Sequence, residues 1–269
     1  MSCNNDCKNC KIKGNCSEKK YFTLTNSKIT KIIGIMSGKG GVGKSTVTAT
    51  LASMLNKMGK RVGILDADIT GPSIPAAFGV HGRLNGNEKL MYPAVSKNGI
   101  KMVSVNLLLD EETSPVVWRG PILGNAIKQF YSECVWEELD YLLIDMPPGT
   151  SDVQLTVLNN IPVDGVVVVS TPQDLVSMVV AKAVTMIKKI GIPIVGVIEN
   201  MSYLTCPCCG NEINVFGESH LEQECLKYDL KPLAKLPIDP SLAKLIDQGK
   251  IEDYETNKYN KTILEIEKL

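Results

Sequence analysis

Residues Gly38 to Ser45 read GKGGVGKS and have the spacing of a phosphate-binding loop. In the pattern G-x-x-x-x-G-K-S, the glycines let backbone N–H groups converge on phosphate oxygens at the start of a helix. Lys44 then reaches the terminal phosphates, and the Ser45 hydroxyl binds Mg²⁺. The loop follows an apolar run and precedes an amphipathic one, which is the context that gives the pattern meaning. These residues predict a site for a nucleoside triphosphate with Mg²⁺.

Two acidic stretches are expected to complete this site. Asp145 ends the apolar run YLLID, and an acidic residue in that place commonly holds the Mg²⁺ shell through water. In ILDAD, Asp68 is the candidate for positioning or activating the attacking water, and Asp66 supports it near the metal. The alternative for Asp66 is that it only caps a helix or turn. The segments DITGPSIP and MPPGTSD, rich in proline and glycine, suit switches that move between nucleotide states.

Cysteines gather at two places in the chain. Cys206 and Cys209 form C-x-x-C within TCPCCGNE and supply half of the ligands for tetrahedral zinc or for an iron–sulfur cluster. Two such pairs would meet if the protein forms a two-fold dimer. Cys208 is either an additional ligand or a bystander. Spacing alone leaves zinc and iron–sulfur open, with a thioredoxin-like redox pair as a third possibility.

The N-terminal sixteen residues contain Cys3, Cys7, Cys10 and Cys16, enough ligands for one metal centre in a single chain. Zinc, unligated thiols and a disordered tail are the alternatives. The spacing of the first three cysteines also occurs in radical enzymes that use S-adenosylmethionine, but those enzymes have a barrel and no phosphate loop. We therefore predict a flexible, Cys-rich metal- or cluster-binding segment over residues 1–27 and an ATPase domain over residues 28–269.

The elements that must position these residues alternate between short β-branched runs and helix-period segments. Runs such as LLI and VVVV are apolar throughout, as in parallel strands covered on both faces. Helical spacing follows the loop at Val47, Leu51, Leu55 and Met58, and Gly59 and Gly191 are placed as C-terminal glycines. The pattern predicts an α/β fold with a doubly wound, mostly parallel sheet. Its expected strands are Ile29–Met36, Arg61–Leu65, Lys101–Val105, Tyr141–Ile144, Gly165–Ser170, Ile194–Ile198 and Leu233–Leu236.

Composition narrows the functional class. Among 269 residues, 29 basic and 29 acidic side chains give a formal net charge of zero, whereas a nucleic-acid binder usually has a basic surface. The sequence contains no run of eighteen apolar residues and no signal peptide. We expect no nucleic-acid or membrane partner and a cytoplasmic location, where cysteines are more often metal ligands or thiols than disulfides.

The second lysine of the loop, Lys39, is similar to one in a wider ATPase class. GKGGVGKS resembles the deviant phosphate loop of partitioning and division-site ATPases, of nitrogenase iron protein and of iron–sulfur carriers. That resemblance implies that Lys39 crosses a homodimer interface and contacts the partner's nucleotide. A positive charge there would act during phosphoryl transfer much as an arginine finger does.

From about Ile29 onward, the chain resembles the Mrp/ApbC family of ATP-binding iron–sulfur cluster carriers. The motifs that carry the resemblance are SGKGGVGKST, DADITGPSIP, VWRGPIL, DYLLIDMPPGTSD, STPQD, IENMSYLTCPCCG and LPIDPSLA. The resemblance implies a dimeric parallel-sheet ATPase that holds a labile [4Fe–4S] cluster and transfers it to recipient apoproteins. ATP hydrolysis, expected to be slow, would be coupled to loading or release of the cluster.

Site residues follow from this resemblance by position. Cys206 and Cys209 become ligands of a cluster that bridges two subunits, and Asn200, Pro237 and Asp239 become neighbours of the adenine. The N-terminal cysteines resemble those of the nucleotide-binding-protein branch found in eukaryotic cytosol, although Cys3 lies closer to Cys7 than the first cysteine of that branch does. The nucleotide cradle comprises Gly38, Lys39, Gly40, Gly41, Val42, Gly43, Lys44, Ser45 and Thr46.

Two other functions remain open at this point. A zinc-stapled regulatory ATPase would use the same loop but deliver nothing. A positioning ATPase would need a basic face or an amphipathic C-terminal anchor. The C-terminal KYNKTILEIEKL has some apolar period but a polar face of mixed charge, and a positioning ATPase has no need of C-x-x-C.

Overall fold

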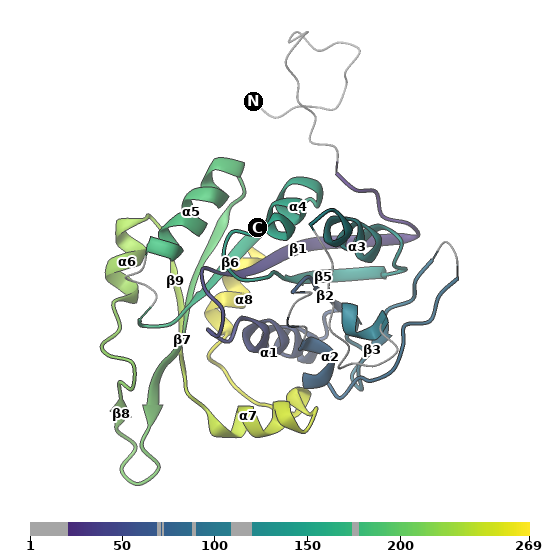
Figure 1. Ribbon diagram of the computed structural model, residues 1–269. Coiled ribbons are helices and arrows are strands. Elements are labelled where there is room, and N and C mark those ends of the chain that lie inside the picture. Colours follow the sequence, from purple (N-terminus) through teal and green to yellow (C-terminus); the bar gives the residue numbers. More distant parts are fainter. Residues whose placement is uncertain (1–20, 69–70, 72, 88–89, 109–119, 174–177) are drawn as a thin grey trace.

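The computed structural model describes residues 21–68, 71, 73–87, 90–108, 120–173 and 178–269. Its centre is a sheet with the strand order β3-β4-β2-β5-β1-β6-β7-β8, and β9 pairs with β7 (Figure 1). The pairs are parallel except for β3–β4 and β7–β8. The strands are β1 (Ser27–Ser37), β2 (Val62–Asp66), β3 (Ala94–Val95), β4 (Lys101–Val103), β5 (Glu137–Asp145), β6 (Gly165–Ser170), β7 (Ile194–Thr205), β8 (Glu212–Ile213) and β9 (Pro232–Pro237).

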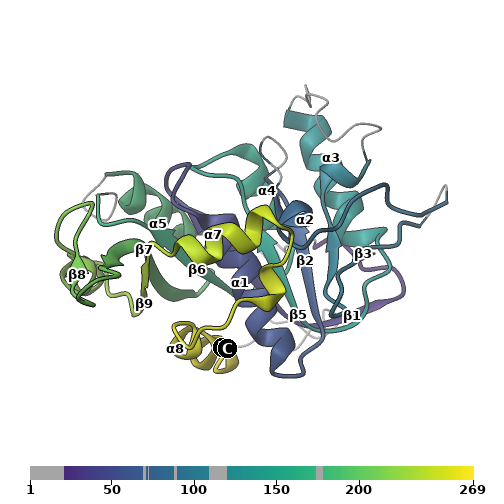
Figure 2. The same ribbon diagram turned by 90° about the horizontal axis from the view of Figure 1, so that it is seen from below.

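Helices cover both faces of this sheet (Figure 2). One apolar core packs β-sheet residues against α3, α4, α5 and α6, and the second packs them against α1, α2, α7 and α8. Along β1, Ile32 and Met36 enter the first core while Ile33 and Ile35 enter the second, as alternating side chains of a strand must. The helices are α1 (Lys44–Lys57), α2 (Ile74–Ala77), α3 (Gly120–Ser132), α4 (Asp152–Asn160), α5 (Met178–Ile190), α6 (Leu221–Lys227), α7 (Pro240–Asp247) and α8 (Asn260–Glu267), with 3₁₀ turns η1 (Val105–Leu108) and η2 (Ile251–Asp253).

The fold confirms the predicted doubly wound α/β class and all seven predicted strands, with differences at their ends. Every residue of β2 and β6 is buried, which is why both runs are apolar up to their last residues, Asp66 and Ser170. β7 was predicted to end at Ile198 but continues to Thr205, because its outer half pairs with β8 and β9. The two-residue strands β3 and β8 were not predicted, since such short pairings leave almost no periodic pattern.

The helix after the phosphate loop is amphipathic as predicted, with one error. Val47, Leu51 and Leu55 are fully buried, but Met58 lies beyond the last helical turn and is 54% exposed. The chain turns away there through Gly59, whose φ of 80° suits glycine, and α5 ends in the same way at Gly191. The predicted apolar face ended one turn too late.

The described chain begins at residue 21, so the N-terminal cysteines lie outside the described residues. Residues 21–26 lie against the main body: Phe22 and Leu24 pack on the core that contains α3 and α4. The Phe22 N–H donates to the Asn160 carbonyl at 2.7 Å. Within the described ranges, no helix is both long enough and apolar enough to span a membrane.

Candidate nucleotide site and cysteine hairpin

The phosphate loop connects central strand β1 to α1 at the carboxyl end of the sheet. Gly41 and Gly43 have φ values of 80° and 78°, a conformation that other residues rarely adopt. Gly43 is the N-cap of α1, and its carbonyl accepts the Val47 N–H at 3.0 Å. The unpaired N–H groups of the first helical turn therefore face the loop, where they and the helix dipole favour an anion such as phosphate.

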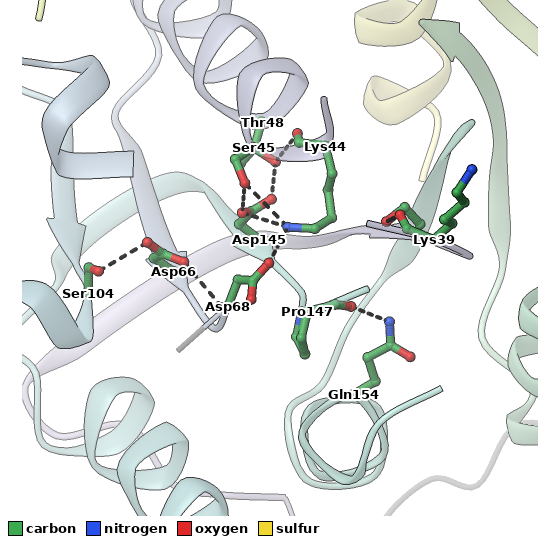
Figure 3. Close-up of polar contacts among 11 residues, drawn as sticks. Lys39, Lys44, Ser45, Thr48, Asp66, Asp68, Ser104, Asp145, Pro147 and Gln154 are labelled. Carbon is green, nitrogen blue, oxygen red and sulfur yellow. Dashed lines mark hydrogen bonds and ion pairs between the residues drawn. The ribbon is translucent and has the colours of Figure 1, made fainter. Parts of the chain in front are cut away.

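Asp145, the last residue of β5, is the centre of a buried polar cluster (Figure 3). Its carboxylate accepts from Lys44 Nζ at 2.7 Å, from Ser45 Oγ at 2.6 Å and from Thr48 Oγ1 at 2.7 Å. The Asp145 side chain is fully buried and that of Lys44 is 6% exposed. Three donors from one helix satisfy the charge, so the carboxylate is compatible with full burial.

Asp66 and Asp68 extend this cluster from the neighbouring strand. Asp66 ends β2 directly beside Asp145 in the parallel register and accepts from Ser104 Oγ at 3.0 Å and from the Asp68 N–H at 3.2 Å. Burial, and then the nearby Asp145 carboxylate, raise the pKa of Asp66 well above that of an ordinary aspartate. The Asp68 carboxylate lies 3.5 Å from Lys44 Nζ and is 13% exposed. Asp66 therefore has both a turn contact, with the Asp68 N–H, and a place beside Asp145 at the centre of the cluster.

The cluster contains oxygen atoms suited to binding Mg²⁺ and a lysine suited to binding a triphosphate. Ser45 Oγ and the Asp145 carboxylate oxygen lie 2.6 Å apart, and oxygen atoms of this kind are the ligands that Mg²⁺ prefers. A pocket of about 280 Å³ is lined by residues 39–46 together with Asp68, Gly71, Ser73, Ser37 and Pro148. In Figure 3 the Lys39 side chain points away from Asp145 and Lys44. The predicted cradle thus shares one pocket with described residues of the two segments predicted to be switches, namely Gly71, Ser73 and Pro148.

The residues predicted near adenine lie beside α1. Asn200 and Pro237 line one small pocket with Thr46, Tyr254 and others from the C-terminal part of the chain. Asp239 caps α7 through the Ser241 N–H at 2.8 Å, and it accepts from the Tyr254 hydroxyl at 2.8 Å. Asp239 therefore contacts a wall of the pocket instead of lining it.

Cys206 and Cys209 lie on the turn between β7 and β8, with Cys208 between them. We call residues 204–213, which comprise this turn and the paired strand ends, the cysteine hairpin. The Cys206 N–H donates to the Asn211 carbonyl at 2.8 Å, and the Gly210 N–H donates to the Cys206 carbonyl at 2.9 Å. Cys206 is half-buried, and Cys208 and Cys209 are exposed. Hydrogen bonds from the backbone N–H groups of Cys209 and Cys208 lower the pKa of the Cys206 thiol. The Cys206 thiol therefore loses its proton more readily than an ordinary thiol does, and the thiolate is the form that binds metals.

Sequence reasoning missed three polar residues around the nucleotide site. Thr48 lies one helical turn after Lys44, a spacing that could have indicated its contact with Asp145. Ser104 comes from a distant segment, and no local pattern indicated its bond to Asp66. Gln154 Nε2 donates to the Pro147 carbonyl at 2.6 Å and so fixes the segment after Asp145 (Figure 3). Among the described residues, no group of three or more His, Cys, Asp or Glu is arranged to hold a metal.

A phosphate loop after the central strand, with carboxylates at the ends of β5 and β2, defines this chain as a nucleotide-binding P-loop NTPase. Solved structures with the same fold include the septum-site protein MinD of Pyrococcus horikoshii with Mg-ADP. That protein has a TM-score of 0.60 and 23% identity, and the match covers 90% of this chain and 96% of that one. At this identity the likeness concerns the fold alone.

The chain belongs to the ParA family described as NUBPL iron-transfer P-loop NTPase, whose model matches residues 28–268. It is 45% identical to the iron–sulfur cluster carrier protein of Clostridium perfringens over 92% of this chain and 90% of that protein. It is 44% identical to the carrier of Methanocaldococcus jannaschii over 92% and 89%. A nucleotide-binding protein from Archaeoglobus fulgidus, solved with ADP, has a TM-score of 0.77 and 43% identity, with 86% of this chain and 91% of that one covered.

Proposed function

We propose that this protein is an ATP-dependent carrier of iron–sulfur clusters. In this proposal a [4Fe–4S] cluster is its cargo, which Cys206 and Cys209 of two copies hold together and pass to recipient apoproteins. The observation that carries the proposal is the hairpin: two thiols on an exposed turn, one of them with a lowered pKa, at the end of a strand that passes the nucleotide site. The carrier names of relatives that are 45% and 44% identical support it.

The nucleotide acts at the other end of that strand. Backbone N–H groups of residues 38–46 bind the phosphates, and Lys44 leaves Asp145 for the terminal phosphates as they enter. Mg²⁺ would be held by Ser45 directly and by Asp145 through water, and when bound it supplies charge neutralisation on the phosphate oxygens. Asp68 orients the water that attacks the γ-phosphorus, so that the bond to the bridging oxygen breaks and ADP and phosphate are formed.

The homodimer connects ATP hydrolysis to the placement of the two cysteine pairs. Lys39 of one copy contacts the nucleotide of the other, so the nucleotide state and the dimer geometry depend on each other. Hydrolysis changes the separation of the two hairpins, and four thiolates shared between two chains then release a cluster by ligand exchange with a recipient's thiolates. Slow turnover suits such a switch, because each hydrolysis event commits one transfer.

The N-terminal cysteines, Cys3, Cys7, Cys10 and Cys16, form a second part of this proposal. We propose that residues 1–27 carry a separate metal or cluster site and that residues 28–269 form the ATPase domain. Four thiols in one segment can complete a centre without the partner subunit, unlike the pair at the hairpin. The second candidate function, a zinc-binding regulatory ATPase, is favoured by the same ligand types, because zinc also takes tetrahedral thiolate sites.

Anaerobic reconstitution with iron and sulfide tests the carrier function. The wild type is compared with Cys206→Ala/Cys209→Ala, and Cys208→Ala is the matched control on the same turn. We expect a brown wild type with broad absorption near ~400 nm and roughly four irons per dimer at the hairpin site. The double variant should lose that iron, and iron that remains reports the N-terminal site.

Transfer is then measured by incubating the loaded protein with an apo-ferredoxin and following recovery of the ferredoxin spectrum with ATP, with ADP and without nucleotide. A colourless protein that retains zinc and refuses iron would sink the carrier proposal in favour of the regulatory ATPase. Loading without transfer would restrict the protein to storage.

A further inference from the structure

The outer half of β7 contains an irregularity between the nucleotide site and the cysteine pair. Glu199 pairs with Lys235 of β9 and Tyr203 pairs with Pro237, so four steps along β7 match two along β9. Within this bulge Met201 has a φ of 54°, an uncommon value for a residue other than glycine. Bulges and strained residues of this kind persist where the surrounding contacts impose them, often beside functional sites.

The bulge contacts the phosphate loop directly. Asn200 Nδ2 donates to the Val42 carbonyl at 2.9 Å in a buried hydrogen bond. The two segments are so close that a Cβ atom placed on Gly43 would lie 2.3 Å from Asn200 Nδ2. Neither segment can move toward the other, and the hydrogen bond opposes their separation. The loop and the bulge are therefore mechanically joined.

A buried carboxylate braces the same bulge. Glu199 is fully buried, and its Oε1 accepts from Ser202 Oγ at 2.5 Å across the strained Met201. Its other oxygen, Oε2, has no hydrogen-bond partner in the described part of the chain. A buried acceptor without a donor is costly, and the cost would fall in an arrangement that supplies one. A second arrangement of the bulge that gives Glu199 Oε2 a donor would therefore be favoured by this hydrogen bond.

Beyond the bulge a continuous ladder leads to the thiols. The Tyr203 carbonyl accepts the Ile238 N–H at 2.7 Å, and Leu204 and Thr205 pair with β8. Cys206 follows, held by Asn211. Asn200 and Cys206 are six residues apart, a span of about 20 Å in an extended strand. Displacement of the bulge would move this ladder as a unit.

We infer that Asn200 is a positioning residue that transmits the state of the phosphate loop along β7 to Cys206 and Cys209. Phosphate binding moves the Val42 carbonyl, Asn200 follows it, and the bulge shifts the hairpin within one chain. This route differs from motion of the segments after Asp68 and Asp145, which carry no cysteine. Its meaning for cluster release rests on the proposed function, but the transmission itself does not.

Alkylation of the hairpin thiols tests the transmission without any cluster. Metal-free, reduced protein is treated with iodoacetamide under saturating ADP or a non-hydrolysable ATP analogue, at a concentration where sedimentation shows single chains. Mass spectrometry gives the alkylation rates of Cys206 and Cys209. In the wild type we expect the rate to differ between the two nucleotides by about fivefold or more, as is typical of coupled sites.

Three variants and one control decide the role of Asn200. Asn200→Ala, and Asn200→Asp, which keeps the shape but removes the donor, should bring the rate ratio close to one at nucleotide concentrations that saturate each variant. Met201→Gly, which fits the positive φ without strain, should also lower the ratio by loosening the bulge. Thr205→Ala, exposed and nearer to the thiols, should keep the wild-type ratio.

A wild type without nucleotide dependence, or a folded Asn200→Ala variant that keeps the full ratio, would overturn the inference. Retention of the ratio by Asn200→Asp would overturn the role of the hydrogen bond. Each of these results leaves the reconstitution experiment unaffected, because no iron is present. A protein that refuses iron would in turn leave the alkylation result standing, so the two proposals fail separately.

Discussion

The phosphate-loop centre and the cysteine hairpin are opposite kinds of site within one chain. At the first, Asp145 is fully buried and its partners Lys44, Ser45 and Thr48 come from the same chain. At the second, Cys208 and Cys209 are exposed, and the C-x-x-C pair has two of the four thiols that a tetrahedral metal or cluster site needs. The first site is organised before any ligand arrives, whereas under the proposed function the second would take its ligand set from two copies of the chain.

This difference indicates how the two sites divide the work. Burial and charge make the nucleotide centre sensitive to every change of its partners, because an unpaired buried charge is costly. Substitutions on the exposed turn should change the unfolding free energy little, and its thiols remain accessible for ligand exchange. We therefore expect substitutions at the nucleotide centre to affect folding and turnover together. Substitutions at the hairpin should affect metal binding alone.

The largest effect is expected for Lys44→Ala. It removes the cation beside the buried Asp145, which is also the group proposed to reach the terminal phosphates. Turnover of ATP should fall by about 10²–10³-fold, as for loss of one preorganised transition-state donor. The nucleotide-free protein should lose about 1–3 kcal/mol of unfolding free energy, because the carboxylate loses a partner. Phosphate release and urea unfolding measure the two quantities.

Lys97→Ala, at an exposed lysine between β3 and β4, is the matched control and should change neither quantity measurably. If Lys44→Ala leaves the unfolding free energy unchanged, the buried pair is not a stabilising element of the nucleotide-free chain. The contrast between the two sites would then concern catalysis only.

The second prediction asks whether the nucleotide centre is complete in one chain. Lys39→Ala alone should lower turnover strongly while the protein still binds ATP, if this lysine acts across the dimer. Mixed with Lys44→Ala chains, it should regain about a quarter of wild-type turnover, because half of the dimers are mixed and one site in each has both lysines. Turnover of the mixture against the separate variants is the measurement, and no gain on mixing would assign Lys39 to its own chain's site.

The sequence was a good guide where local spacing determines structure. The phosphate loop, its two flanking carboxylate strands and the parallel sheet follow from apolar runs and from residues adjacent in the chain. Asp66 and Asp145 meet because β2 and β5 are neighbours, and parallel strands bring their carboxyl ends to one edge.

Long-range contacts could not be predicted in the same way. Ser104 reaches Asp66 across 38 residues and Asn200 reaches Val42 across 158, and no periodic pattern encodes either pair. The bulge at Met201 was also invisible, because its positive φ occurs at a residue that gives no turn signal. Tertiary packing, rather than local preference, imposes these features.

The third prediction concerns the charge that burial disfavours. Because the pKa of Asp66 is raised in the folded chain, the folded state binds its proton more tightly than the unfolded state does. The associated stability is complete below about pH 4, the ordinary aspartate value, and is lost as pH rises through the folded pKa. Asp66→Asn should therefore stabilise the nucleotide-free protein by about 1 kcal/mol or more, or about 2–4 °C in Tm, at alkaline pH.

Differential scanning calorimetry of Asp66→Asn and wild type at pH 5 and pH 8.5, without Mg²⁺, measures this effect. The gain should be larger at the higher pH, and ATP turnover in the presence of Mg²⁺ should fall because the proposed Mg²⁺ site loses a charge. An equal gain at both values would mean that Asp66 keeps its charge when buried. The attraction between Lys44 and the Asp66 carboxylate would then outweigh the cost of burying that charge.

The smallest effect is expected from Cys209→Ser on the hairpin, with Cys208→Ser as its control. Both side chains are exposed, so the unfolding free energy should change by no more than about 0.5 kcal/mol. The Cys206 thiol should keep a pKa below that of an ordinary thiol, because the backbone N–H groups that lower it most remain. The pH dependence of Cys206 alkylation measures that pKa. A return to the ordinary value in Cys209→Ser would mean that the Cys209 side chain, and not the backbone of the turn, lowers the pKa of the Cys206 thiol. The pKa of one cysteine of the pair would then depend on the side chain of the other.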